Sequence, residues 1–217
     1  MIAIIDYGMG NLRSVQKAFE VTGAGAKITS RAADLAKAEK VVFPGVGSFG
    51  EAMAELRRRK LVDPIKGAIA EGKPFLGLCL GLQLLFERSE EAPGVKGLGV
   101  LSGRVKRFKP AVHSPRPNAQ TLKVPHMGWN SISFQLSAFS FQQNILKGID
   151  RGSYVYFVHS YYVDPEDKSV TLTTTDYGIR FVSGISKDNL FGLQFHPEKS
   201  QDTGLKIVKN FVRIKCR

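Results

Sequence analysis

Cys79 is the residue of this sequence best placed to act as a nucleophile. It stands in the apolar run 73–89, KPFLGLCLGLQLLFERS, with Gly77 two positions before it and Gly81 two positions after it. A strand that turns sharply into a helix strains its apex residue, and glycines on both sides remove the clash with neighbouring side chains. Free N–H groups at the start of that helix would favour the nucleophilic thiolate. A buried structural cysteine is the alternative interpretation, and the motif alone leaves it open.

A cysteine nucleophile needs a base, and His196 is the best candidate. It follows the apolar run LFGLQF, residues 190–195, and is followed by Pro197 and Glu198. The proline fixes the backbone where the strand ends, and a carboxylate two positions from the imidazole can orient it and stabilise its charged form. The remaining histidines are predicted to be solvated or structural: His113, His126 and His159.

Chemistry at a carbonyl group also needs donors for the oxyanion. The N–H of Leu80 is one candidate, and the glycine-rich segment 43–50, FPGVGSFG, can supply a second. That segment also matches the dinucleotide fingerprint at Gly45, Gly47 and Gly50. However, it follows the third predicted strand, and no acidic residue ends the next strand, as a ribose contact requires. A non-enzymatic nucleotide-binding module is therefore a minor alternative.

The elements that must position these residues alternate in type along the first half of the chain. Short apolar runs at 2–6, 26–30, 40–45 and 73–79 predict strands. Helical patterns lie between and after them, at 11–23, at 48–72 with an interruption at Pro64, and at 80–91. This alternation predicts a doubly wound parallel sheet flanked by helices, of flavodoxin-like type, with ligand sites at the carboxyl ends of its strands.

The second half is strand-rich. Apolar runs at 99–108, 124–134, 152–163, 169–178, 180–189 and 190–198 are separated by turn residues and predict antiparallel pairing. The segment 109–123 is predicted to be a proline-rich surface loop, and 135–144 has no assignment. Residues 206–217 predict a final amphipathic helix whose packed side carries Ile207, Val208, Phe211, Val212 and Ile214. The expected fold class is a single-domain α/β protein with an antiparallel second half.

The composition indicates a soluble globular chain, with 43% hydrophobic and 23% charged residues. Its longest apolar N-terminal run, IAII, is too short for a secretory signal or a membrane span. Two cysteines make no disulfide framework, so we expect a cytoplasmic protein. The histidines and cysteines lack the spacing of metal ligands, and no metal or cofactor is expected.

The net charge of +12, from 31 basic and 19 acidic residues, raises the question of an anionic partner. The basic residues cluster at 57–60, 104–109 and 206–217. No aromatic ladder accompanies them, and no RRM, zinc-finger or helix-turn-helix pattern is present, so we expect no nucleic acid and interpret the clusters as solvated faces. An acidic partner protein stays open.

Three motifs in order resemble the class I, triad-type glutamine amidotransferases: PGVG at 44–47, GLCLGLQLL at 77–85 and HPE at 196–198. Four further stretches are similar to the branch of this family that provides the glutaminase subunits of imidazole glycerol phosphate synthase: DYGMGNLRSV at 6–15, HMGWN at 126–130, YFVHSYYV at 156–163 and FHPEKS at 195–200. The resemblance covers nearly the whole chain and implies one amidotransferase domain over 1–217.

The resemblance implies that Cys79, His196 and Glu198 form a triad that hydrolyses the side-chain amide of glutamine. It also implies a substrate-binding set of Gly45, Val46, Gly47, Leu80, Gln83, Ser160 and Tyr161. The ammonia would pass to a separate (β/α)₈ cyclase subunit of histidine biosynthesis, with Asn11, Trp129 and Lys199 near the interface. Because the oxyanion strand of this family is expected to be misaligned until the cyclase binds its ligand, the isolated chain should hydrolyse glutamine poorly.

Two further enzymatic alternatives stay open. The glutaminase subunits of anthranilate synthase and pyridoxal phosphate synthase share the triad and differ only in flanking motifs. A Cys-His hydrolase of the peptidase-like α/β group would share the strand-to-helix turn around Cys79, but it would cleave peptides or esters and ignore glutamine.

Overall fold

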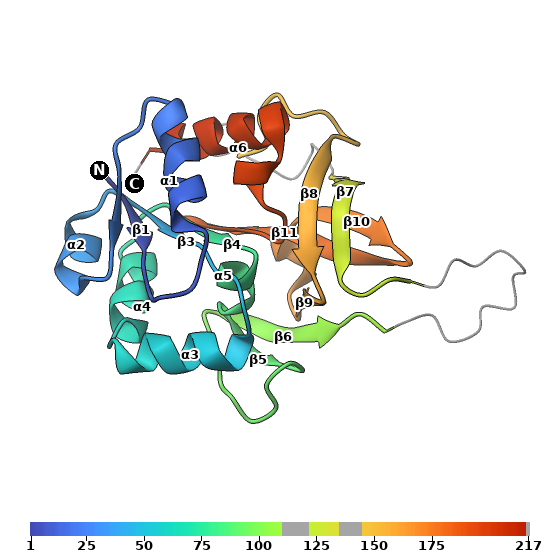
Figure 1. Ribbon diagram of the computed structural model, residues 1–217, viewed down its shortest axis with the longest axis horizontal. Coiled ribbons are helices and arrows are strands. Elements are labelled where there is room, and N and C mark those ends of the chain that lie inside the picture. Colours follow the sequence, from blue (N-terminus) through green and yellow to red (C-terminus); the bar gives the residue numbers. More distant parts are fainter. Residues whose placement is uncertain (110–121, 135–144, 216–217) are drawn as a thin grey trace, which may run out of the picture.

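A computed structural model describes residues 1–109, 122–134 and 145–215. Its first half alternates strands and helices, as the sequence predicts (Figure 1). The elements of this half are β1 (Ile2–Ile5), α1 (Leu12–Val21), β2 (Ala26–Thr29), α2 (Ala32–Lys37), β3 (Lys40–Phe43), α3 (Phe49–Arg58), α4 (Val62–Ala70), β4 (Phe75–Leu78), α5 (Leu80–Gln83) and β5 (Phe86–Ser89).

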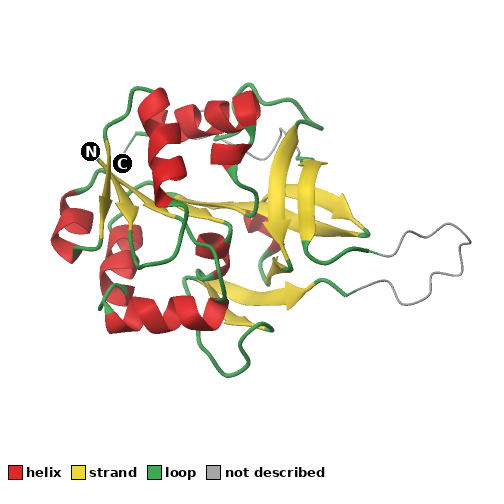
Figure 2. Cartoon of the chain, viewed as in Figure 1, coloured by secondary structure: helices red, strands yellow, loops and turns green. Residues whose placement is uncertain are grey.

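The second half is mostly strands, also as predicted, and it ends in a helix (Figure 2). Its elements are β6 (Leu101–Arg107), β7 (His126–Ser131), β8 (Tyr154–His159), β9 (Tyr161–Pro165), the 3-10 turn η2 (Lys168–Val170), β10 (Thr171–Tyr177), β11 (Ile179–Lys187), β12 (Leu190–Leu193), the 3-10 turn η3 (Pro197–Lys199) and α6 (Gln201–Arg213).

Ten of the described strands form one mixed sheet in the order β2-β1-β3-β4-β12-β11-β9-β6-β5, with β10 paired to β11. The strands from β2 to β12 are parallel neighbours, and β11 runs antiparallel to β12, to β9 and to β10. β7 and β8 form a separate antiparallel ribbon. The parallel first half and the antiparallel later strands confirm the predicted fold class, an α/β mixed sheet.

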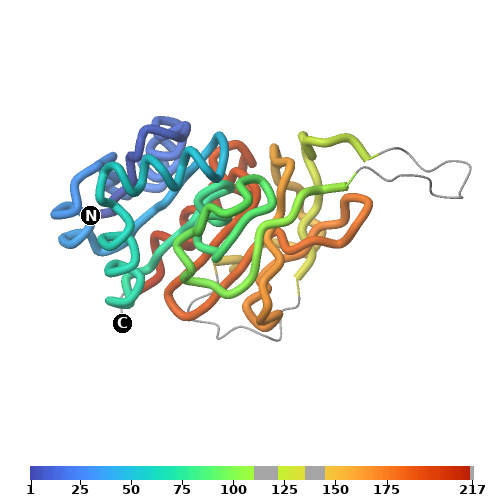
Figure 3. Tube along the Cα trace, turned by 90° about the horizontal axis from the view of Figure 1, so that it is seen from below, coloured from blue at the N-terminus to red at the C-terminus, as the bar shows by residue number. Residues whose placement is uncertain are grey.

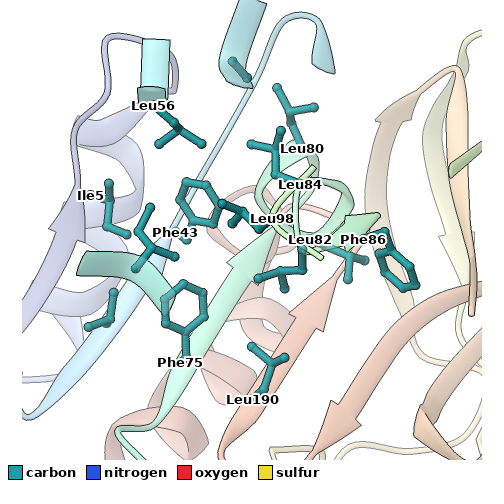
Figure 4. Packing of buried hydrophobic residues seen from close by; sticks show 14 of the residues in the cluster. Ile5, Phe43, Leu56, Phe75, Leu80, Leu82, Leu84, Phe86, Leu98 and Leu190 are labelled. Atoms are coloured by element: carbon teal, nitrogen blue, oxygen red, sulfur yellow. The ribbon is translucent and has the colours of Figure 1, made fainter. Parts of the chain in front are cut away.

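The parallel strands β1, β3, β4 and β12 are buried on both faces, because their side chains point alternately to the two sides of the sheet and helices cover both sides. One apolar cluster contains Ile5, Phe43 and Phe75 and packs against α3 and α4, as Figure 4 shows. The other cluster contains Ile4, Val42 and Leu76 and packs against α1, α6 and β8. Figure 1 shows β1, β3 and β4 between α1 and α6 on one side and α3 and α4 on the other, and Figure 3 shows the N-terminal segments in blue at one end of the molecule and the yellow and orange strands toward the other. β4 and β12 pair in parallel, so their carboxyl ends lie at the same edge of the sheet.

The sequence misplaced two helix boundaries. The helical stretch 48–72 breaks at Lys60, whose φ is +54°, and Pro64 lies in the first turn of α4, where a missing N–H removes no helical hydrogen bond. The helix predicted over 80–91 is a single turn, because Phe86–Ser89 pairs with β6 as a strand. A short apolar run does not distinguish a buried strand from a buried helix, so this pairing was not visible in the sequence.

The predicted strand 152–163 divides at Ser160. β8 pairs with β7 in the ribbon, whereas β9 pairs with β6 and β11 in the main sheet. The chain thus passes from one sheet to the other beside Cys79, and Figure 1 shows β8 and β9 at this corner. The final helix buries Ile207, Val208 and Phe211, three of its predicted packed residues.

Two predicted segments, 109–123 and 135–144, lie wholly or largely outside the described residues, as does His113. Within the described part of the chain, no helix is long and apolar enough to cross a membrane.

Candidate active site

Cys79 occupies a strained turn between β4 and α5. Its φ of +52° and ψ of −109° are rare for a residue with a side chain, and its N–H donates to the Leu193 carbonyl at 2.7 Å. The residue is only 6% exposed. Because α5 has four residues, its dipole is small, and groups facing the sulfur must supply most of the stabilisation of a thiolate.

The glycines beside Cys79 have separate structural reasons. A Cβ on Gly77 would lie 3.0 Å from the Gly81 carbonyl oxygen, so this glycine accommodates the turn itself. A Cβ on Gly81 would lie 1.8 Å from the Phe43 carbonyl oxygen, on the neighbouring strand β3. The first glycine confirms the expected clash within the turn, and the second allows the close contact between helix and sheet that the alternative interpretation of the motif predicts.

The side chain of Gln194 faces the sulfur. Its Nε2 donates to Cys79 Sγ at 3.7 Å, and its Oε1 accepts from Gln83 Nε2 at 3.2 Å. Gln194 is fully buried at the end of β12. Sequence reasoning missed this residue, although a glutamine inside the apolar run LFGLQF was a signal for it.

His196 reaches the same pocket from the adjacent strand. β4 and β12 pair in parallel with Leu78 opposite Leu193, so the chain segments that follow them leave the same edge of the sheet. The His196 N–H donates to the Tyr156 carbonyl at 2.9 Å, which fixes the backbone next to η3. Nδ1 of His196 lies 2.8 Å from Glu198 Oε1, and both side chains are almost fully buried. The His-x-Glu spacing therefore produces the predicted imidazole–carboxylate pair.

Electrostatics favour the charged form of His196. Burial alone would lower the pKa of this imidazole, but the Cys79 sulfur and the Glu198 carboxylate outweigh it and raise the pKa to about 10. Nε2 is buried and has no aligned hydrogen bond to any described residue, the sulfur included. The Cys79 sulfur is nevertheless close enough to stabilise the charged ring, and Nε2 is available to carry a proton to a bound reactant.

A cavity of about 340 Å³ joins these groups. Among the predicted site residues, those that line it are Val46, Gly47, Cys79, Leu80, Gln83, Ser160, Tyr161 and His196. Gly45 is not among the lining residues, and a Cβ added to it would lie 3.0 Å from the Gly81 nitrogen. The N–H groups of Val46 and Leu80 donate to no described residue, so neither is committed to another acceptor.

Further residues of the cavity wall were not predicted: Glu91, Pro125 and Val158. Glu91 supplies the only carboxylate among the described lining residues, and one of its oxygens accepts from the Phe49 N–H at 2.8 Å. A carboxylate held in this way can bind a ligand ammonium group.

His159 also lines the cavity, but a hydrogen-bond chain occupies both of its nitrogens. Nδ1 donates to the Tyr161 carbonyl at 2.8 Å, so Nε2 must accept from Nδ1 of His126 at 3.0 Å. The second nitrogen of His126 faces Asn130 Nδ2 at 3.2 Å. Burial lowers the pKa of His159 to about 3 and that of His126 to about 4. Both rings are therefore neutral, in agreement with their interpretation as structural residues.

The residues expected near a partner lie on the exposed surface. Trp129 is 46% exposed and packs edge-on against Tyr156 at 6.1 Å, and Lys199 Nζ lies 5.8 Å from the same ring. Asn11 stands at the N-terminus of α1, without a side-chain capping bond, and α1 packs against η3, the turn that bears Lys199. Tyr156 thus brings two of the three expected residues together.

The chain matches the family model described as "Glutamine amidotransferase class-I" over residues 3–214. It is 53% identical to the imidazole glycerol phosphate synthase subunit HisH of Syntrophotalea carbinolica, over 97% of this chain and 98% of the relative. It is 49% identical to the protein of the same name from Caldanaerobacter subterraneus subsp. tengcongensis, over the full length of both chains.

Solved structures with the same fold have much lower identity. The structure of PurLQS from Thermotoga maritima matches with a TM-score of 0.68 at 18% identity, covering 97% of this chain and 96% of that chain. The glutaminase domain of Trypanosoma brucei CTPS with bound acivicin matches with a TM-score of 0.64 at 17% identity, covering 100% of this chain and 97% of that chain. At these identities the likeness establishes the fold alone.

Proposed function

Because this chain belongs to the class I glutamine amidotransferase family, and within it to the HisH glutaminase subunits of imidazole glycerol phosphate synthase in histidine biosynthesis, we propose that Cys79, His196 and Glu198 are its catalytic triad. The observation that carries the proposal is the one cavity lined by Cys79, Leu80 and His196, with the Val46–Gly47 turn on its wall. We also propose that residues 1–217 make one amidotransferase domain, which the family match over 3–214 supports.

The first half of the reaction releases ammonia. The Cys79 thiolate attacks the carboxamide carbon of glutamine, and the resulting oxyanion accepts from the N–H groups of Leu80 and of the 45–47 segment. His196 then gives its Nε2 proton to the departing nitrogen as the C–N bond breaks. The products of this step are ammonia and a γ-glutamyl thioester on Cys79. Glu198 keeps the imidazole oriented throughout and stabilises its positive charge.

The second half restores the enzyme. Neutral His196 takes a proton from water, and the hydroxide that forms attacks the thioester carbon. The C–S bond breaks and glutamate leaves, while the sulfur returns to the thiolate beside the charged imidazole. The raised pKa of His196 suits the start of this cycle, because the imidazolium is the form present beside the thiolate before it attacks glutamine.

Polar groups of the cavity wall can bind the α-amino and α-carboxyl ends of the glutamine substrate. Gln83 uses both amide hydrogens, on the Tyr161 carbonyl and on Gln194, so its carbonyl oxygen is the group left to face the ligand. Glu91 offers the negative charge that an α-ammonium group needs. The chain segment at Ser160 and Tyr161 borders the same space.

We propose that the partner is the (β/α)₈ cyclase subunit HisF, in a one-to-one heterodimer. The name of the relatives supports a partner subunit, and the exposed Trp129, Lys199 and Asn11 are the proposed contacts. The cyclase would combine the ammonia with its phosphoribulosyl formimino carboxamide nucleotide to make imidazole glycerol phosphate and aminoimidazole carboxamide ribonucleotide. A protected path would keep the ammonia unprotonated near pH 7.

The test is a glutaminase assay on the chain alone, with the cyclase, and with the cyclase plus its ligand. We expect little hydrolysis by the chain alone, strong stimulation by the liganded cyclase, and loss of activity in Cys79→Ala under every condition. A cyclase without its ligand controls for stabilisation by binding alone. Full activity of the isolated chain would contradict the dependence on the partner, and an active Cys79→Ala would contradict the triad.

A further inference from the structure

Tyr7 has a buried hydroxyl group without a hydrogen-bond partner. The residue follows β1 and is fully buried in the same apolar cluster as Phe43, with their rings 5.5 Å apart. Its hydroxyl accepts from and donates to no described residue. Buried hydroxyl groups nearly always have partners, because leaving one unpaired in an apolar interior is unfavourable. Such an exception next to a catalytic centre calls for a functional explanation.

The hydroxyl lies against the glycine turn behind the cavity. A Cβ added to Gly45 would be 2.3 Å from the Tyr7 oxygen and 3.0 Å from the Gly81 nitrogen. The oxygen is thus directly beside the α-carbon of Gly45, the residue that precedes Val46 on the cavity wall. Burial, and to a lesser extent the charge of Cys79, raises the pKa of Tyr7 above its ordinary value, so the hydroxyl keeps its proton and can act as a donor.

The peptide unit between Gly45 and Val46 connects this hydroxyl to the cavity. In a trans peptide the carbonyl and the N–H point in opposite directions, so turning one group inward turns the other outward. Tyr7 and Gly45 are not among the residues that line the cavity, whereas Val46 is, so a Gly45 carbonyl turned toward Tyr7 would turn the Val46 N–H toward the cavity. In this structure that carbonyl does not accept from Tyr7. Glycine at positions 45 and 47, with φ of +95° at Gly47, keeps such a rotation sterically accessible.

On the basis of the proposed function, we propose that Tyr7 is a positioning residue for the oxyanion site. Its hydroxyl donates to the Gly45 carbonyl when the turn is in its catalytic conformation, and this bond directs the Val46 N–H at the oxyanion. The unpaired hydroxyl disfavours the conformation described here and so favours the catalytic one. Tyr7 does not touch the reactant, and it acts only through the peptide that does.

The test is Tyr7→Phe, which removes the oxygen and keeps the ring. Glutaminase activity is measured on the complex with the cyclase and its ligand, and thermal unfolding is measured on the chain alone. We expect kcat to fall about tenfold or more with KM within about twofold, since one hydrogen bond made in the transition state is lost. We also expect the unfolding temperature to stay the same or to rise by about 2–4 °C, because an unpaired buried group is removed.

Phe75→Leu is the matched control, since it perturbs the same cluster without touching the turn at residues 44–47. It should lower the unfolding temperature and leave kcat near that of the wild type. An unchanged kcat in Tyr7→Phe overturns the inference, as does a fall in kcat that accompanies a lower unfolding temperature. A wild-type complex with no glutaminase activity overturns the proposed function and this inference together, whereas an active wild type with an equally active Tyr7→Phe overturns the inference alone.

Discussion

The paired imidazoles of His126 and His159 predict that mild acid destabilises this fold. Both rings are nearly inaccessible, 3% and 6% exposed, and each is hydrogen-bonded as a neutral base. Burial lowers their pKa values to about 4 and about 3, below the ordinary 6.5. Below pH 6.5 the unfolded chain therefore binds more protons than the folded chain, and the free energy of unfolding falls as the pH decreases.

The size of this loss of stability follows from how far the pH lies below 6.5, the pKa of a histidine in the unfolded chain. At pH 5 the unfolded imidazoles are mostly protonated and the folded ones are not, so each ring removes about 2 kcal/mol of stability relative to pH 7.5. The two rings together remove about 4 kcal/mol. The raised pKa of His196 opposes this loss between pH 7.5 and 6.5, where its contribution to stability grows by about 1.4 kcal/mol as the pH falls; below pH 6.5 that contribution is constant.

Urea unfolding of the wild type and His126→Phe at pH 7.5 and pH 5 measures this effect. Phenylalanine can stack as His126 does, between Tyr177 at 3.9 Å and Phe157 at 4.7 Å, but it cannot be protonated. We expect the variant to lose about 2 kcal/mol less stability than the wild type between the two pH values, because one of the two neutral rings is gone. Phe157→Leu, the control, should be less stable at both pH values and keep the full pH-dependent loss. Equal losses in the wild type and His126→Phe would refute the reasoning.

Two further predictions concern the site and its frame. Glu198→Gln keeps the shape of a buried side chain but removes the charge beside His196. It should lower the kcat of the cyclase-stimulated glutaminase by about 10²- to 10⁴-fold. A change in kcat of less than about threefold, measured on folded protein, would exclude a role for this carboxylate in stabilising the imidazolium. Gly81→Ala places a Cβ against the Phe43 carbonyl and should destabilise the chain by more than about 4 kcal/mol in urea unfolding. Gly67→Ala, in open space on α4, should stabilise it by about 0.5–1 kcal/mol. Similar values for the two variants would contradict the close contact between Gly81 and the Phe43 carbonyl.

Local sequence patterns predicted the elements of the first half because each strand there is a continuous apolar run between helical repeats. The same runs placed Cys79 at the end of β4 and His196 just beyond β12, and the His-x-Glu spacing predicted the pair that lies 2.8 Å apart. These features need only neighbours in the chain. The family motifs then added the substrate and the partner, which residue chemistry alone left open.

The features that were not predicted depend on contacts between distant segments. The stretch Phe86–Ser89 is a strand because β6 pairs with it, although its apolar pattern fits a helix equally well. Glu91 lines the cavity from a segment with no local signal for chemistry, and the contact of Gln194 with the Cys79 sulfur depends on the pairing of distant strands. Segments 110–121 and 135–144 lie outside the described residues, so the predictions for them stay predictions.

The order of residues along the chain was sufficient to determine which groups could react, because a nucleophile between glycines and a base two positions from a carboxylate are both local patterns. The tertiary structure decided how those groups meet, since the parallel pairing of β4 with β12 brings positions 79 and 196 to one edge of the sheet. It also decided which buried groups stay unpaired, as at Tyr7, because a hydrogen bond depends on the position of both partners in space.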